Sequence, residues 1–192
     1  MIEPKMRAMR CQQVENLIVG APCGVMDQMA AICGEAGSLM ALLCQPAEFQ
    51  GGVRLPDELG VWGIDSGIRH AVTGADYVGV RVGAFMGYRI LADLAGLRVT
   101  AGECDGHVGV HDPRWHGYLA NVGSDTFRRY APEIPTALDG STFLGRYQGT
   151  TDLVTRVDPT RRYAIRTPTE HPVYEHERVA EWVRHLDVGA SR

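Results

Sequence analysis

The sequence of 192 residues lacks the features that define several broad classes of protein. It has no run of about 18 consecutive apolar residues, so no membrane-spanning helix is predicted. Its first residues, MIEPKMRAMRCQQ, contain no long apolar stretch, and we therefore expect no secretory signal there. The formal net charge of −4 provides no basic surface for nucleic acid or for an anionic membrane.

The five cysteines follow no pattern typical of a disulfide framework or a zinc site. Their number is odd and no two of them form a C-x-x-C pair, so we expect buried, reduced thiols. Reduced thiols in turn predict a cytoplasmic location. These residues are Cys11, Cys23, Cys33, Cys44 and Cys104.

Glycine-rich phosphate-binding motifs are also absent. The sequence contains neither a G-x-x-x-x-G-K loop nor a G-x-G-x-x-G turn. If phosphate chemistry takes place here, much of the phosphate-binding surface is expected to lie outside this chain. Apolar residues make up 45% and charged residues 22% of the sequence, as in a packed globular domain.

Apolar spacing and turn residues predict helices and strands in the first third of the chain. Helices are expected over residues 4–18 and 24–33, on either side of a turn at Ala21–Pro22. Short apolar stretches bounded by turn residues predict strands over residues 38–45 and 60–68.

The rest of the chain is predicted to be mostly helical. A long helix is expected over residues 76–96, with Gly96 as its C-cap, and its glycines at 79, 83 and 87 form a face for close packing. Residues 98–113 are expected to form a loop, residues 114–148 short helices, and the last helix is expected to start near Val173. Because helices and strands do not alternate regularly, this order favours an α+β fold over a parallel sheet.

The stretch VGAPCGVMDQMAAICG, residues 19–34, places a single carboxylate, Asp27, in an apolar run. Burial of an ionised carboxylate without partners is costly, so Asp27 is either satisfied structurally or placed for function. Glu15 lies before the turn and Asp27 after it, and a reversal of the chain would bring both to one side. Two such carboxylates suit a magnesium–phosphate complex and a general base. Alternatively, Glu15 is a solvated helix residue and Asp27 caps its own helix.

Three further segments carry groups that suit ligand binding. In IDSGIRHAVTGADY, Arg69 suits phosphate or carboxylate recognition, although it can equally pair with Asp65 or Asp76. HVGVHDPRWH brings three histidines near Asp112, but their spacing matches no zinc pattern. RRYAIR, residues 161–166, is either an anion-binding patch or a solvated charged surface.

The strings CQQVENLIVGAPCGVMDQM and WGIDSGIRHAVTGADYVGVRVGAFMGYRI together resemble the GHMP small-molecule kinases, in particular their galactokinase and arabinokinase-like branch. The resemblance covers residues 9–95 strongly. It continues more weakly through the segment TFLGRY and the later segment DLVTRVDPTRRYAIRTPTEHPVYEHERV.

The resemblance implies an ATP-dependent monosaccharide 1-kinase that requires Mg²⁺ and acts on L-arabinose or D-galactose. By position, Asp27 is the catalytic carboxylate and also contacts the sugar, and Glu15 is the magnesium ligand. Backbone around Cys23 and Gly24 lines the sugar pocket. Two residues of the later loop complete the implied site: Tyr77, which contacts the sugar, and Arg69, which lies near the active site.

The family's two-lobe fold is expected to be only partly present. Residues 1–75 correspond to the end of the N-terminal lobe with the catalytic carboxylate, and residues 76–192 to an incomplete helical part of the C-terminal lobe. The family's phosphate loop and its late glycine-rich segment have no counterpart here, so no ATP-contacting residues are assigned. The chain is therefore expected to be the central part of a sugar kinase. The alternative is a non-catalytic, truncated or degenerate module without ATP binding of its own.

Overall fold

The computed structural model describes residues 2–68, 75–102 and 104–189, which form two compact units. The first unit takes in Met1–Thr73 together with Ala180–Arg192, and the second takes in Gly74–Val179. Each unit has its own apolar cluster and is described by itself. Helices and small antiparallel sheets occur together, as the expected α+β class requires.

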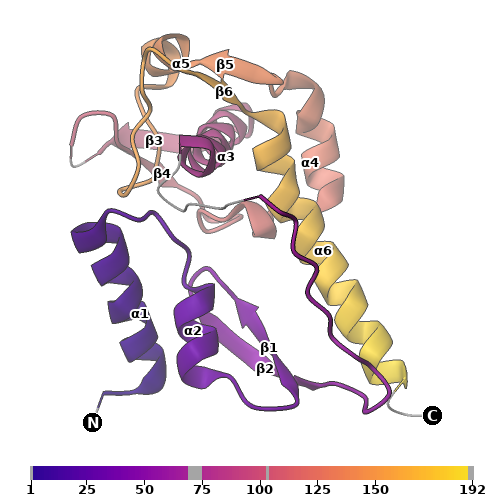
Figure 1. Cartoon of the computed structure of the whole chain (residues 1–192). Coiled ribbons are helices and arrows are strands. Elements are labelled where there is room, and N and C mark those ends of the chain that lie inside the picture. Colours follow the sequence, from indigo (N-terminus) through magenta and orange to yellow (C-terminus); the bar gives the residue numbers. More distant parts are fainter. Residues whose placement is uncertain (1, 69–74, 103, 190–192) are drawn as a thin grey trace. The chain divides into compact units, whose positions relative to one another are not determined.

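In the first unit, two helices precede a β-hairpin (Figure 1). The small core contains four buried residues: Ala8, Val25, Met29 and Ala47. The elements are α1 (Pro4–Val14), the π-helical turn η1 (Glu15–Val19), α2 (Met26–Cys33), β1 (Ser38–Leu43) and β2 (Glu48–Arg54). The two predicted helices and the first predicted strand are confirmed, although β1 is only half-buried.

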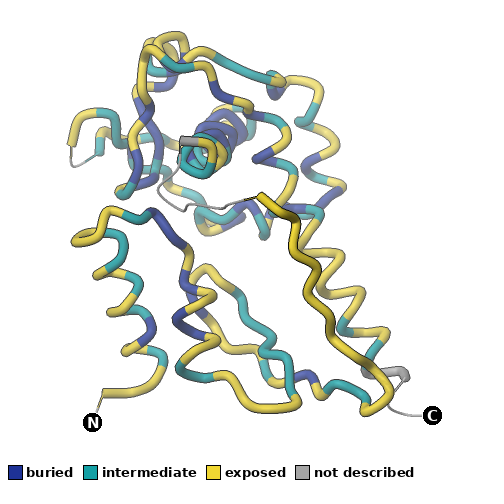
Figure 2. Tube along the Cα trace, in the orientation of Figure 1, coloured by how far each residue is buried: buried dark blue, intermediate teal, exposed yellow. Residues whose placement is uncertain are grey.

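The strand predicted over residues 60–68 is wrong. These residues form no ladder in the part of the chain that the structure describes, and residues 57–68 are exposed throughout (Figure 2). The partner of β1 is instead β2, which the sequence analysis missed. Gly51 and Gly52 conceal the apolar alternation of β2, and Gly51 has a φ of +125° beside an irregularity in the ladder.

The second unit is built around α3 (Ala75–Leu94), much of which is buried (Figure 2). Its two small sheets pair β3 (Arg98–Ala101) with β4 (Val108–His111), and β5 (Ala137–Asp139) with β6 (Arg162–Ala164). The remaining elements are η2 (Leu119–Asn121), α4 (Ser124–Tyr130), η3 (Ala131–Glu133), α5 (Gly140–Tyr147) and α6 (Arg166–Gly189), of which α6 continues into the first unit.

The glycine face of α3 is confirmed as a packing surface. A Cβ on Gly83 would lie 2.2 Å from the carbonyl oxygen of Ala164, and one on Gly87 would lie 1.6 Å from Oγ1 of Thr169. The end of β6 and the start of α6 therefore approach the α3 backbone as closely as glycine allows. Gly96, with a φ of +68°, follows α3 as the predicted C-cap.

Two expectations for the second unit are wrong. Residues 98–113 contain the β3–β4 hairpin, in which a Cβ on Gly109 would lie 2.6 Å from Oγ1 of Thr100. That glycine serves close cross-strand packing. The last helix begins at Arg166, earlier than predicted. Pro168 lies in its first turn, where a missing N–H group costs no hydrogen bond, and Pro172 lies inside the helix.

A buried ion pair anchors the long loop after α5 to α3. The guanidinium of Arg81 donates to both carboxylate oxygens of Asp152 at 2.8 Å, and the Thr155 hydroxyl donates to the same group at 2.6 Å. Burial acts to raise the pKa of Asp152, but these hydrogen bonds and the Arg81 charge outweigh it and lower that pKa. The Asp152 carboxylate therefore stays ionised in the interior.

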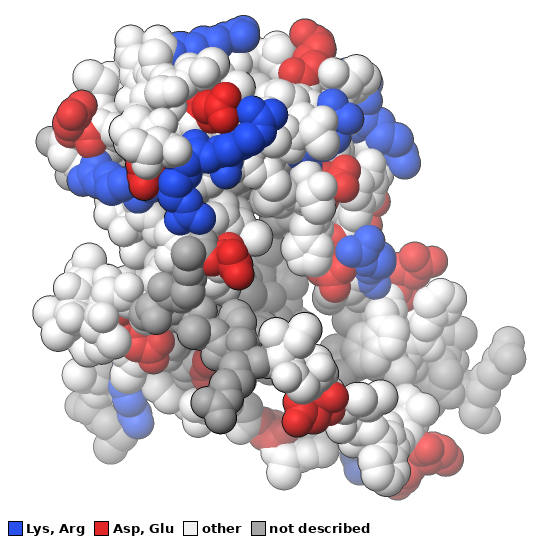
Figure 3. Space-filling view, turned by 45° about the horizontal axis from the view of Figure 1, so that its top comes forward, with Lys and Arg blue, Asp and Glu red and all other residues white. Residues whose placement is uncertain are grey.

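The basic stretch at residues 161–166 is largely used within the fold. Arg162 pairs with Asp139 at 3.1 Å, and Arg166 donates to the carbonyl of Ile134. On the face drawn in Figure 3, acidic side chains lie beside the basic ones. These contacts favour a solvated charged surface over an anion-binding patch.

We expect Gly83→Ala to destabilise the second unit by ~1–3 kcal/mol or more, because the added methyl group meets backbone that has no room to move. Chemical denaturation measures the effect. The matched control is Gly145→Ala on α5, where a Cβ would meet nothing within 4 Å and helix propensity predicts a neutral or slightly stabilising change. Equal stability of the two variants would contradict close packing at Gly83.

Asp152→Asn is expected to lower the free energy of unfolding by about 3 kcal/mol at pH 7, because it removes one partner of a buried pair. The lowered pKa of Asp152 means that its contribution is present above the unfolded pKa of ~3.9 and is lost as pH falls through the folded value. The difference from the wild type should therefore shrink in acid. The exposed pair variant Asp139→Asn serves as the control and should change stability by less than ~1 kcal/mol.

Candidate catalytic site

The candidate site is built on the chain reversal between α1 and α2. Gly20, with a φ of +77°, ends the π-helical turn, and the N–H of Ala21 donates back to the carbonyl of Glu15 at 2.9 Å. Cys23 is held by its own N–H, which donates to the Ala21 carbonyl, and by its carbonyl, which accepts from the Gln12 side chain at 3.2 Å. Local hydrogen bonds thus fix the backbone that leads into α2.

The buried thiol of Cys23 links both sides of this reversal. It donates to Oε2 of Glu15 at 3.0 Å and lies 3.7 Å from Oδ1 of Asn16. From α2, Nε2 of Gln28 donates to the sulfur at 3.7 Å. One side chain therefore holds the end of the first helical segment against the start of the second.

The two titratable groups of this contact are pushed in opposite directions. Hydrogen bonds from Cys23 and Gln28 lower the pKa of Glu15. Burial, followed by the hydrogen bond to Glu15 and the charge of that carboxylate, raises the pKa of the Cys23 thiol. At neutral pH the site therefore contains a carboxylate at residue 15 and a protonated thiol at residue 23.

Asp27 is exposed, so its carboxylate is not buried in the apolar run that surrounds it in the sequence. The apolar residues of this segment lie on more than one side of the chain: Val25 and Met29 face the core, whereas Met26 faces solvent with Asp27. Asp27 is also not the cap of its helix, because the N-cap position is Val25 and no side-chain cap bond forms there. Its carboxylate lies in the first turn of α2, where the helix dipole favours a negative charge.

The other predicted site residues are distributed between the two units. Gly24 is exposed in the first unit, and a Cβ there would meet nothing within 4 Å, so the space beside its backbone is open. Tyr77 lies half-buried in the first turns of α3, in the second unit. Arg69 lies outside the described residues.

Glu15 is chemically suited to holding a magnesium ion. Its side chain is an ionised carboxylate, which is a hard oxygen ligand, and only one of the two oxygens accepts the hydrogen bond from the Cys23 thiol. Mg²⁺ takes one or two protein carboxylates and fills its shell with phosphate and water oxygens. Within residues 2–68, 75–102 and 104–189, no group of three or more His, Cys, Asp or Glu residues gathers for a metal ion.

The histidine-rich segment contributes a structural carboxylate. Asp112 accepts hydrogen bonds from the Tyr88 hydroxyl at 2.8 Å and from the backbone N–H groups of Arg114, Trp115 and Gly117. Burial opposes ionisation, but these donors outweigh it and lower the pKa of Asp112. Its oxygens hold the turn after β4, which leaves little capacity for a metal ion.

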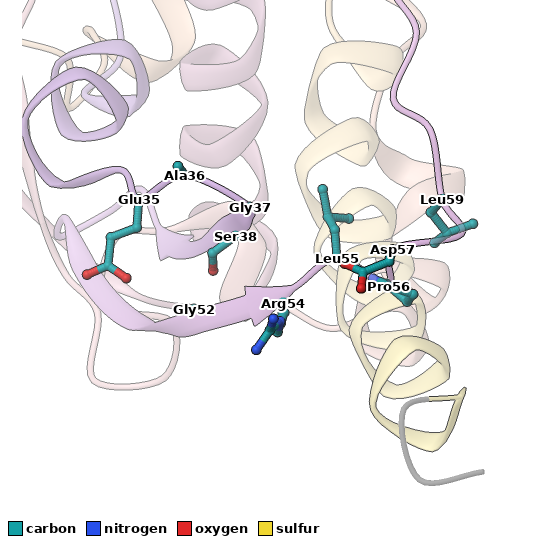
Figure 4. Close-up of a pocket in the computed structure, with 10 residues that line it drawn as sticks. All are labelled: Glu35, Ala36, Gly37, Ser38, Gly52, Arg54, Leu55, Pro56, Asp57 and Leu59. Carbon is teal, nitrogen blue, oxygen red and sulfur yellow. The ribbon is translucent and has the colours of Figure 1, made fainter.

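A hollow of ≈ 600 Å³ lies at the open end of the hairpin (Figure 4). Its polar lining comes from Glu35, Ser38, Arg54 and Asp57, on the turn before β1 and on the chain that leaves β2. None of the predicted site residues lines it. We therefore place the candidate site at the chain reversal, where buried, hydrogen-bonded polar groups converge.

Sequence reasoning missed three side chains and one backbone feature of this site. Gln12, Asn16 and Gln28 position Cys23, and η1 places the Glu15 side chain on the turn. Gln12 and Gln28 belong to the motif strings CQQVE and CGVMDQ, so the motif was the sequence signal that could have identified them as site residues. The thiols were also partly misjudged: all five are free as expected, but Cys11, Cys44 and Cys104 are exposed.

The comparisons with known proteins point to one class, the sugar kinases. L-arabinokinase of Arabidopsis thaliana is 42% identical over 191 residues, which cover 93% of this chain and 18% of that protein. Galactokinase of Chloroflexus aurantiacus is 36% identical over 89 residues, or 46% of this chain and 23% of that protein. Human galactokinase is 32% identical over 71 residues, or 37% of this chain and 18% of that protein.

The resemblance to the arabinokinase and galactokinase branch of the GHMP sugar kinases is therefore confirmed. Among these relatives, L-arabinokinase is similar along nearly the whole chain. The chain spans less than a quarter of the length of each of these relatives. No protein-family model and no solved structure matches the chain. In the described residues, no helix is long and apolar enough to cross a membrane.

We expect Cys23→Ala to raise the pKa of Glu15 back toward its ordinary value, because the thiol is the main hydrogen-bond donor to that carboxylate. An NMR titration of the Glu15 side-chain carboxyl carbon measures the shift. Cys33→Ala is the control, since Cys33 is a half-buried cysteine of α2 that packs on the core of the first unit and does not contribute to the lowered pKa of Glu15. An unchanged Glu15 titration in Cys23→Ala would show that the thiol does not set this pKa.

Proposed function

We propose that the chain is part of an ATP-dependent monosaccharide 1-kinase, which converts a sugar and ATP into sugar 1-phosphate and ADP. The observation that carries the proposal is the C-Q-x-x-E and C-G-x-M-D-Q constellation, which the fold holds together through the Cys23 thiol. The kinase similarity supports the reaction class. L-arabinose is the first candidate substrate, because the relative named L-arabinokinase matches more of the chain than the galactokinases do, and D-galactose is the second.

Asp27 is the proposed general base and also a sugar contact. Its exposed carboxylate, in the first turn of α2, is accessible to a sugar hydroxyl. As the anomeric oxygen forms its bond to the γ-phosphorus, the bond from that phosphorus to the ADP oxygen breaks. The hydroxyl proton passes to Asp27 and then to solvent.

The residues around the reversal position the sugar and the ion. The carbonyl and N–H of Cys23 are fixed by hydrogen bonds, and the open space beside Gly24 allows a sugar to approach the backbone. Glu15 is the proposed magnesium ligand, and the ion would neutralise charge on the ATP phosphates. Tyr77, at the start of α3, is the proposed further contact to the sugar, and Arg69 is the proposed further residue of the active site.

The two-lobe assignment belongs to the same proposal. Residues 1–75 represent the end of the N-terminal kinase lobe, and residues 76–192 an incomplete helical part of the C-terminal lobe. A cytoplasmic location accords with the five free thiols.

The second candidate is a non-catalytic sugar-kinase module without ATP binding of its own. It is favoured by the absence of a glycine-rich phosphate loop from residues 1–192. Calorimetry of the isolated chain with ATP–Mg²⁺ and with each sugar separates the candidates. Tight ATP binding by the isolated chain would exclude the second one.

The catalytic role of Asp27 can be tested in a chimera in which this chain replaces its matching segment of the Arabidopsis L-arabinokinase. We expect the chimera to phosphorylate L-arabinose or D-galactose. Asp27→Asn should lower kcat by ~10²–10⁴-fold, since the hydroxyl proton then has no acceptor. A coupled assay of ADP release measures the rate.

The control for this test is Glu35→Gln, which removes an exposed carboxylate just beyond α2 and should leave kcat unchanged. Turnover of Asp27→Asn within about twofold of the parent would exclude Asp27 as the base. A folded chimera that phosphorylates no monosaccharide would contradict the kinase proposal itself.

A further inference from the structure

Another pocket, of ≈ 420 Å³, lies entirely within the second unit. Its lining comes from the end of α3, from the chain that runs from η3 into β5, and from α5 (Figure 1). Pockets of this size hold small metabolites in other proteins. Among the described residues, none of those proposed for the catalytic site lines it, so the pocket has no part in the site at the chain reversal.

Three polar side chains of this pocket are available to a ligand: the carboxylate of Glu133, the hydroxyl of Thr142 and the guanidinium of Arg146. All three residues are exposed, and in the described part of the chain no hydrogen bond or ion pair engages their side chains. Other exposed arginines of α6 and β6, Arg178 and Arg162, each pair with a carboxylate. Arg146 is therefore a free cation at the edge of a cavity.

A buried guanidinium adds to the positive charge on this side of the pocket. The ring of Tyr147, which lines the pocket, has the guanidinium carbon of Arg146 at 5.0 Å and that of Arg89 at 5.3 Å from its centroid. Arg89 is only 6% exposed, and its buried Nε and Nη1 lack hydrogen-bond partners in the described structure. Its ion-pair partner, the exposed Asp93, lies 3.6 Å from Nη1. A buried charge that is incompletely compensated favours an anion nearby.

The rest of the lining suits the carbon skeleton and the hydroxyl groups of a sugar. Leu94, Pro135 and Leu138 supply half-buried apolar surface. An ionised carboxylate only accepts hydrogen bonds, so Glu133 suits hydroxyl donors and disfavours a second anionic group. The guanidinium fork of Arg146 matches the oxygens of one phosphate.

We propose that this pocket binds a sugar phosphate, with the phosphate on Arg146 and sugar hydroxyl groups on Glu133 and Thr142. The inference rests on the proposed function, because the product of a monosaccharide 1-kinase is a ligand of this kind. It goes beyond that function, since it assigns the product a site in the second unit whose lining residues take no part in the proposed reaction.

An NMR titration of the ¹⁵N-labelled chain with L-arabinose 1-phosphate and D-galactose 1-phosphate, without ATP or Mg²⁺, tests the proposal. We expect saturable shift changes at the amides of residues 133–147 and at the Arg146 side chain. Arg146→Gln should weaken binding at least about tenfold, because it removes the charge-assisted hydrogen bonds to the phosphate. The matched control is Arg162→Gln, which alters an exposed arginine of the same unit and should leave the affinity unchanged.

Inorganic phosphate should bind more weakly than either sugar phosphate, and Glu133→Ala should reduce this difference. Equal affinities of the wild-type chain for all three would overturn the proposal, in favour of a site for anions only. The absence of shifts at residues 133–147 with about 10 mM sugar phosphate would also overturn it. Shifts confined to residues 15–27, or unchanged binding by Arg146→Gln, would have the same consequence.

These outcomes are separate from those that test catalysis. Binding of a sugar phosphate in the pocket, together with a folded chimera that phosphorylates no sugar, would contradict the proposed function alone. An active chimera, together with a chain that binds no sugar phosphate at residues 133–147, would contradict this inference alone.

Discussion

The hydrogen bond between the Cys23 thiol and the Glu15 carboxylate is the contact on which the candidate site depends. It joins a π-helical turn to the turn that leads into α2, across a reversal that has a left-handed glycine and little apolar packing of its own. π-Helical turns are rare and often occur at functional sites. Here the turn places a carboxylate beside a buried thiol and keeps it ionised. On α2, the Gln28 side chain is turned toward the sulfur, whereas Asp27 faces solvent.

The second unit is held by a different constraint, the close approach of backbone to α3. Its glycine face admits the end of β6, and the Arg81–Asp152 pair attaches the loop after α5 to the same helix. The unit therefore has one long buried helix with strands, loops and a further helix placed against it. Tyr77 belongs to the first turns of that helix, so its backbone is positioned by a well-packed element.

Local rules account for the features that the sequence predicted. α2, the glycine face of α3 and the C-cap Gly96 each follow from spacing or backbone preference within a few residues. Features that depend on a partner were missed. The β2 strand is concealed by Gly51, and the hydrogen bonds that position Cys23 join residues on both sides of the turn. The motif resemblance selected Glu15 and Asp27, but only the fold shows that one is bonded and the other open to solvent.

The failed strand prediction over residues 60–68 is informative in the same way. The short apolar stretch that predicted a strand is present in GVWGIDSGI, residues 60–68, but β structure requires a neighbouring strand as well as a pattern. The first unit has a core of four buried residues and a two-stranded sheet, of which Met40 and Leu42 pack on the same core as α2. The reversal that holds Glu15 and Cys23 therefore depends on a small apolar core and on its own hydrogen bonds.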